Sequence, residues 1–237
     1  MLDLAEELML LALDAETGRI HDAARTAIAF GLSGAVLMDL ALTGKISIDD
    51  GKVQAINSAA TGDPVLDTAL RQIENSPRPR KVEDWVKRLA MDRWGRSFLE
   101  DEILERLVSQ GILRREEHRI LRLIPTTRYP EQNRAPERDL MERLRAVLID
   151  GDLPDTRLAA LIGLLQACGL VGVLFTKNKQ AKDRAAAIAR GERTGKDVTA
   201  AVEKATEEVV TAAITAAVVA ATISASTSAA TTTSVTS

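Results

Sequence analysis

The clearest pattern in the chain is a helical run of apolar residues that changes, at one glycine, to an alternating pattern. Seven apolar residues recur at helical spacing, namely Ala27, Ile28, Phe30, Val36, Leu37, Leu40 and Ala41. Gly44 follows them, and glycine readily takes the left-handed conformation in which helices often end. From Ile46 the apolar positions alternate, and Asp50-Gly51 is a favoured sequence for a two-residue hairpin turn. The pattern predicts a buried helix followed directly by a β-hairpin.

The same order of signals returns further along the chain. Residues 98–110 predict an amphipathic helix that stops at Gly111. We expect a strand to open at Ile112-Leu113, a charged turn at Glu116-Glu117 and a returning strand over residues 120–124. Because a helix followed by a hairpin also resembles a winged helix, a nucleic-acid-binding or protein-interaction module remains an alternative.

Helical patterns and helix-starting residues cover much of the remaining chain. We expect further helices over residues 4–13, 63–74, 82–91, 137–149 and 177–190, a buried helix or helix pair over 155–175, and a long alanine-rich helix over 197–223. Asp22 is the expected N-cap of the central helix, and the basic, proline-broken segment 76–81 is expected to be a linker. The fold class is therefore mainly α, a compact single domain of about eight or nine helices with two β-hairpins over residues 1–223. The Ser-, Thr- and Ala-rich residues 224–237 are expected to form a disordered tail.

Composition narrows the class of protein. Aromatic residues make up only 3% of the 237 residues, so the core must be built from aliphatic side chains. The formal net charge of −3 argues against a strongly basic nucleic-acid-binding protein. The N-terminus lacks the basic start of a signal peptide, and no apolar stretch reaches the roughly 18 residues of a membrane span. We therefore expect a cytoplasmic protein.

No pattern in the sequence carries catalytic chemistry. His21 and His118, the two histidines, lie far apart and have no neighbours at metal-ligand spacing. The sequence has no nucleotide-binding glycine loop or nucleophile motif, and its acidic residues are spread over expected helix surfaces. Cys168 is the only cysteine and lies in an apolar run, so we expect it to be buried. The sequence favours a non-catalytic binding protein without a cofactor.

The order and spacing of several segments resemble one known family. These segments are the opening LAEELMLLALDAETGRI, the stretch from Gly31 to Ile46, Thr61-Gly62-Asp63, Gly111-Ile112-Leu113 and the apolar run from Arg157 to Phe175. Together they resemble the Golgi phosphoprotein 3 family, also called the GPP34 domain, from about Leu4 to Ile223. The alanine- and arginine-rich composition suits a bacterial member.

The resemblance implies a mostly helical fold with a projecting β-hairpin that supports self-association. It also implies a peripheral membrane protein without catalysis. Eukaryotic members of this family bind phosphatidylinositol 4-phosphate and hold glycosyltransferases in the Golgi through their cytoplasmic tails. The implied partners are an anionic or phosphoinositide-like lipid headgroup, a membrane-protein client and a second copy of the chain bound through the second hairpin.

The headgroup pocket of the family uses one Trp and three Arg, and none of the four occurs at the matching positions here. Alignment on Gly31-Leu32 places Ala24 at the Trp position and Ser33 at the first Arg position. Alignment on residues 111–113 places Ser97 and Glu100 at the other two. Replacing arginine removes charge-assisted, forked hydrogen bonds to a phosphate. The resemblance therefore supports the fold more strongly than phosphoinositide specificity.

Remaining residues near these positions supply a candidate lipid-headgroup site. Its members are Arg25, Ser33, Arg93, Trp94, Arg96 and Ser97. The indole of Trp94 could sit at a membrane interface while neighbouring arginines meet phosphate, although a solvated loop with one packed indole explains the same residues. Arginines also flank the second hairpin, but the glutamates expected at its tip argue against DNA, so no nucleic-acid partner is expected.

Overall fold

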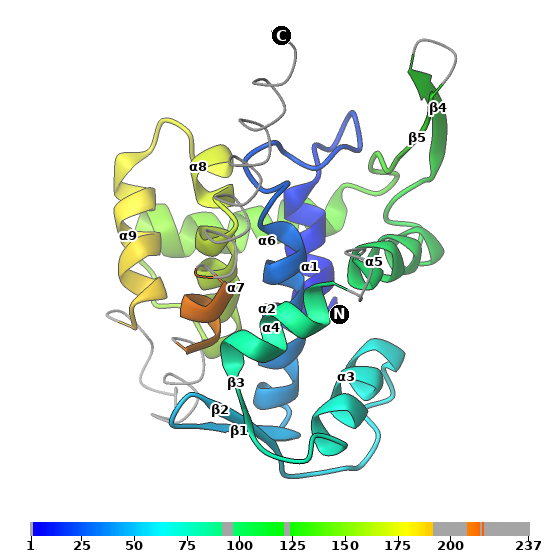
Figure 1. Cartoon of the computed structure of the whole chain (residues 1–237). Helices are drawn as coiled ribbons and strands as arrows, with labels where there is room; N and C mark the ends of the chain where they lie inside the picture. Colours follow the sequence, from blue (N-terminus) through cyan, green and yellow to red (C-terminus); the bar gives the residue numbers. More distant parts are fainter. Residues whose placement is uncertain (1, 92–96, 121–123, 192–207, 214, 216–237) are drawn as a thin grey trace, which may run out of the picture.

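The helix predicted at the centre of the sequence is also the centre of the fold. The computed structural model describes residues 2–91, 97–120, 124–191, 208–213 and 215. α2 (Ile28–Leu42) is surrounded by other helices, as Figure 1 shows. These neighbours are α1 (Leu4–Ala12), α3 (Pro64–Glu74), α4 (Val82–Ala90), α5 (Phe98–Ser109) and α7 (Thr156–Ala167). The described chain is mainly helical, which confirms the predicted fold class.

α2 is buried on all sides because small residues let its neighbours approach closely. Every residue from Ile28 to Leu40 is buried. A Cβ atom added at Gly31 would lie only 2.4 Å from the Cys168 sulfur, and one at Gly34 would lie 3.0 Å from the Leu164 side chain. These contacts fall where α7 packs against α2. The two glycines are therefore needed for close helix packing.

The start of α2 differs from the prediction. The helix begins at Ile28, its N-cap is Ala27, and no side chain caps it. Residues 22–27 form successive turns instead of helix. The Asp22 carboxylate pairs with Arg25 and is too early in the chain to reach the first helical N–H groups. The predicted N-cap role of Asp22 is therefore wrong.

The first hairpin is confirmed and belongs to a three-stranded sheet. β1 (Ile46–Asp49) pairs with β2 (Lys52–Ala55), and Ile48 faces Val53 across the ladder. Asp50 and Gly51 have φ angles of 52° and 68°, as their two-residue turn requires. β3 (Arg80–Lys81) adds a third, antiparallel strand beside β2. The end of the segment predicted as a linker is thus part of the sheet.

The second hairpin is present, but its predicted register is wrong. β4 (Glu116–Ile120) pairs with β5 (Ile124–Arg128), so Glu116 and Glu117 lie in a strand and not in a turn. Ile112 and Leu113 are buried, and their N–H groups donate to the Leu107 carbonyl at the end of α5. Both residues contribute to the core, and Leu113 also forms an isolated antiparallel bridge with Glu131 ahead of β4. Figure 1 shows β4 and β5 projecting from the helical body.

Of the C-terminal helices, α7 packs directly against α2. α6 (Ala135–Arg145) continues into a π-helical turn, η1 (Ala146–Asp150), and α7 is followed by α8 (Leu170–Leu174) and α9 (Lys179–Ala189). Gly169, with φ of 71°, separates α7 from α8, so the predicted apolar run is a helix pair. Residues 208–213 are helical. The rest of the predicted alanine-rich helix, apart from residue 215, and the predicted tail lie outside the described residues.

Candidate functional site

Two of the predicted headgroup positions lie in the interior. Ala24 and Ser33 both have no exposed surface. The Ser33 hydroxyl donates a hydrogen bond of 2.9 Å to the Ala29 carbonyl, one turn earlier in α2. This bond satisfies the only donor of the serine side chain.

The other two positions lie at the N-terminus of α5. Ser97 is the N-cap of α5, and its hydroxyl accepts a hydrogen bond from the Glu100 N–H. Burial, and next the neighbouring charge of Asp101, raise the pKa of the Glu100 carboxyl. The resemblance predicts an arginine at this position, whereas the carboxylate of Glu100 would repel a phosphate.

The remaining members of the predicted headgroup set are not brought together by the described structure. Arg25 is an exposed residue whose guanidinium lies 2.9 Å from the Asp22 carboxylate. Arg93, Trp94 and Arg96 lie outside the described residues. The six-residue lipid-headgroup set therefore stays a prediction.

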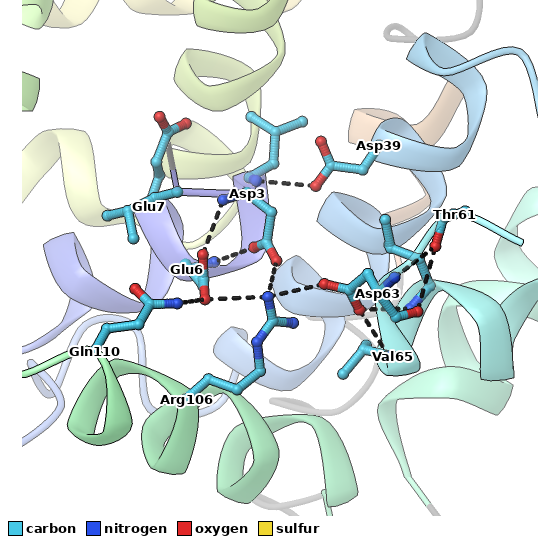
Figure 2. A network of polar contacts seen from close by, with 12 residues as sticks. Asp3, Glu6, Glu7, Asp39, Thr61, Asp63, Val65, Arg106 and Gln110 are labelled. Carbon is cyan, nitrogen blue, oxygen red and sulfur yellow. Dashed lines mark hydrogen bonds and ion pairs between the residues drawn. The ribbon is translucent and has the colours of Figure 1, made fainter.

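A partly buried ionic network joins α1, α3 and α5, as Figure 2 shows. The Arg106 guanidinium of α5 lies 2.9 Å from Asp3, 3.1 Å from Glu6 and 2.8 Å from Asp63. Asp3 caps α1 and Asp63 caps α3, so one arginine holds the N-termini of two helices. Gln110 donates a further hydrogen bond of 2.7 Å to Glu6. These carboxylates are fully engaged in holding the fold.

A second network ties α7 to α1 and α2. The Arg157 guanidinium donates to Asp39 at 2.9 Å, to the Leu2 carbonyl at 2.8 Å and to Glu7 at 3.4 Å. Asp39 also accepts a hydrogen bond from the Leu4 N–H, which Figure 2 shows. Burial outweighs the attraction of Arg157 and raises the pKa of Asp39 to about 6.

The two networks correct the expectation that the acidic residues are spread over solvated surfaces. Glu6, Glu7 and Asp39 are buried, with at most 5% of their surface exposed. Sequence reasoning missed them because their arginine partners lie far away in the chain. One signal was present, since Asp39 interrupts the apolar face of the central helix.

The described residues also show how the cysteine is placed and whether metal-binding groups or membrane-spanning helices occur. Burial raises the pKa of the Cys168 thiol to about 12, so the thiol stays protonated at neutral pH. Across the described ranges, no group of three or more His, Cys, Asp or Glu residues is placed to hold a metal ion. Within the same residues, no helix combines the length and hydropathy that crossing a bilayer requires.

Comparison with known proteins agrees with the order of these elements. A family model described as Golgi phosphoprotein 3 (GPP34) matches residues 4–209. The chain is also 24% identical over 168 residues to vacuolar protein sorting-associated protein 74 of Eremothecium gossypii. That alignment covers 62% of this chain and 49% of the relative, so the chain spans about half of the relative's length. Because the family match extends from α1 to the helical residues after α9, this chain belongs to the Golgi phosphoprotein 3 (GPP34) family.

Proposed function

We propose that this chain is a non-catalytic, cytoplasmic adaptor that binds the surface of anionic membranes. The observation that carries the proposal is the family match over residues 4–209. The mainly helical body and the projecting β4–β5 hairpin support it, because the resemblance implies both. A membrane-protein client and self-association through this hairpin are further parts of the proposal.

The absence of catalysis is proposed from how the reactive groups are used. The buried carboxylates Glu6, Glu7 and Asp39 face arginines and backbone N–H groups, which leaves them poorly suited to act as general bases. Cys168 is buried and its pKa is raised, which disfavours the nucleophilic thiolate.

We propose that the family's headgroup position itself no longer recognises phosphoinositides. Ala24, Ser33, Ser97 and Glu100 supply no cation there. Binding at that face would then come from summed contacts of about 1 kcal/mol for each Lys or Arg near the surface. Such contacts are screened over roughly 8–10 Å near physiological ionic strength, so membrane binding should weaken with salt.

The arginines near the base of the second hairpin give little support to the nucleic-acid alternative, because they are paired with glutamates. Arg114 pairs with Glu116 at 2.9 Å, and Arg115 pairs with Glu105 at 3.0 Å. Ion pairs of this kind reduce the positive potential that would attract a phosphate backbone.

Vesicle flotation tests the proposal against the alternative. The full chain is mixed with phosphatidylcholine vesicles, with vesicles that also contain phosphatidylserine, and separately with duplex DNA, at a low and a high salt concentration. We expect flotation with the phosphatidylserine vesicles at low salt and a decrease at high salt. Binding to DNA without binding to either vesicle would overturn the proposed function.

A further inference from the structure

A basic pocket lies on a different part of the molecule from the family's headgroup positions. It has a volume of about 380 Å³ and is formed by α3, the segment that leads into β3, and α4. These elements follow one another in the lower half of the view in Figure 1. The pocket contains three arginines and the indole of Trp85, and none of its lining residues is acidic. None of Ala24, Ser33, Ser97 or Glu100 lines it.

The three arginines come from three different elements. Arg71 lies in the last turn of α3, Arg80 is in β3, and Arg88 is in the last turn of α4. Each guanidinium is oriented by a local contact. Arg71 donates to the Thr68 hydroxyl at 3.1 Å, Arg80 donates to the Ser76 hydroxyl at 3.1 Å, and Arg88 stacks 6.0 Å from the centre of the Trp85 ring.

Within the described ranges, these three guanidinium groups form none of the close ion pairs that Arg106 and Arg157 have, and Arg71 acts on the Asp67 carboxylate only from beyond ion-pair distance. No ion pair joins Arg71, Arg80 or Arg88 to a carboxylate of a described residue, whereas Arg106 and Arg157 each contact at least two. A guanidinium carries five N–H donors, and the contacts above use only a few of them. The pocket therefore concentrates positive charge and free donors that an anion would satisfy.

Trp85 supplies an independent observation. Its side chain lines the pocket although the residue is only 1% exposed. The indole nitrogen is buried and has no hydrogen-bond acceptor among the described residues. An indole N–H can only donate, and buried donors are normally paired. Within the described part of the chain this donor is left without a partner, while the ring of the same side chain packs beside Arg88.

We propose that this pocket binds a phosphate monoester. The terminal phosphate of a monoester presents three oxygens, which can meet guanidinium groups arriving from three directions, whereas a carboxylate presents only two. The amide side chains of Gln72 and Asn75, which also line the pocket, can orient the group that carries the phosphate.

The surface beside the pocket indicates where that phosphate comes from. A second, smaller hollow of about 190 Å³ shares Thr68, Gln72 and Arg88 with the basic pocket and adds Met91 and Phe98. Met91 is 40% exposed and Phe98 is 61% exposed. Exposed apolar side chains beside arginines suit the interface of a bilayer, where the apolar groups enter the acyl boundary and the cations meet headgroups. The lipid source of the phosphate rests on the proposed function, but the pocket itself does not.

The first arm of the test uses soluble glycerol 3-phosphate. The chain has two tryptophans, so the fluorescence of a Trp94→Phe variant reports on Trp85 alone. We expect a saturable change on titration with glycerol 3-phosphate and none with sodium chloride at equal ionic strength. The Arg71→Ala/Arg88→Ala change in the same background should weaken binding by about tenfold or more. Calorimetric titration of the full chain without the Trp94→Phe change measures the same affinity without relying on tryptophan fluorescence.

A matched control separates the pocket from general charge. Lys81→Ala/Lys87→Ala removes two positive charges from β3 and α4 but replaces no residue that lines the pocket. This variant should bind glycerol 3-phosphate like the parent, and its melting temperature should match that of the arginine variant. Arg71→Lys/Arg88→Lys keeps the charge but loses the forked geometry of the guanidinium. Its affinity for glycerol 3-phosphate should lie between that of the parent and that of Arg71→Ala/Arg88→Ala.

The second arm uses phosphatidylcholine vesicles that contain either phosphatidic acid or phosphatidylserine at equal surface charge. A preference for phosphatidic acid that the Arg71→Ala/Arg88→Ala variant loses would place the phosphate on a lipid. Saturable binding of glycerol 3-phosphate without that preference supports the pocket but assigns it to a soluble monoester. If no saturable response to glycerol 3-phosphate occurs, or if the arginine variant responds like the parent, the pocket proposal is overturned. Binding to both vesicles without a phosphate response leaves the proposed function intact while the pocket fails.

Discussion

Arg157 in α7 lies 2.9 Å from Asp39 in α2, although the two residues are 118 positions apart in the chain. Asp39 is 5% exposed, and Arg157 also holds the Leu2 carbonyl and Glu7. One guanidinium thus fixes the N-terminal segment, the central helix and the helix that packs beside it. The pair stabilises this arrangement mainly because either charge alone would be costly to bury.

We expect Arg157→Leu to destabilise the protein by roughly 3 kcal/mol at pH 7, because Asp39 would remain buried with its charge unpaired. Urea unfolding of the full chain measures the change. The Asp39→Asn/Arg157→Leu double variant removes both charges and should recover part of the loss. Equal stability of the parent and Arg157→Leu would show that the pair contributes nothing.

The raised pKa of Asp39 predicts a pH dependence of stability. The pKa is about 6 in the folded chain against 3.8 for the free side chain, so the folded state holds the proton more tightly. Stability from this group is therefore greatest at low pH and is lost as pH rises from about 4 to about 6, by an amount on the order of 2–3 kcal/mol. The pKa of Glu7 is also raised by burial and adds to the same trend.

Asp39→Asn isolates the contribution of this carboxyl. The amide oxygen can still accept from the Leu4 N–H, but it does not titrate. Free energies of unfolding measured between pH 4 and pH 7 should fall less steeply for Asp39→Asn than for the parent. Parallel curves would mean that Asp39 has no raised pKa in the folded state.

Arg106→Ala should be among the most destabilising single changes in the described chain. It leaves Asp3, Glu6 and Asp63 close together without their shared cation, and we expect a loss of roughly 3 kcal/mol. Arg138→Ala is the control, because this arginine is 68% exposed and surface pairs contribute about 0–1 kcal/mol. Thermal and urea unfolding of both variants make the comparison, and similar losses would contradict the role of the network.

Gly44→Val tests the end of the central helix. Gly44 has a φ of 66°, and a Cβ added there meets nothing within 4 Å. The cost of about 1–3 kcal/mol must then come from backbone strain and not from a clash with neighbours. Gly44→Asn should cost less than Gly44→Val, because asparagine tolerates the left-handed region better. An unchanged melting temperature for Gly44→Val would show that the left-handed conformation of Gly44 is not needed to end the helix.

The sequence by itself determined the elements whose signals are local. The change of period after Gly44 and the Asp50-Gly51 turn identified the central helix and the first hairpin, because both depend on the conformations of adjacent residues. Asp63 before Pro64 marked the start of α3 for the same reason. The family could also be identified from the sequence, because the resemblance rests on the order and spacing of such elements. Its bacterial origin stays a prediction.

The tertiary structure decided the features that depend on distant partners. The core took Ile112 and Leu113, and the continuous ladder of β4 and β5 begins only at Glu116. β3 became a strand only because β2 lies beside it. The burial of Asp39 required an arginine from α7, and the basic pocket required arginines from three elements around Trp85. Periodicity records which face of an element is apolar, but charge pairing and pocket formation depend on which faces meet in space.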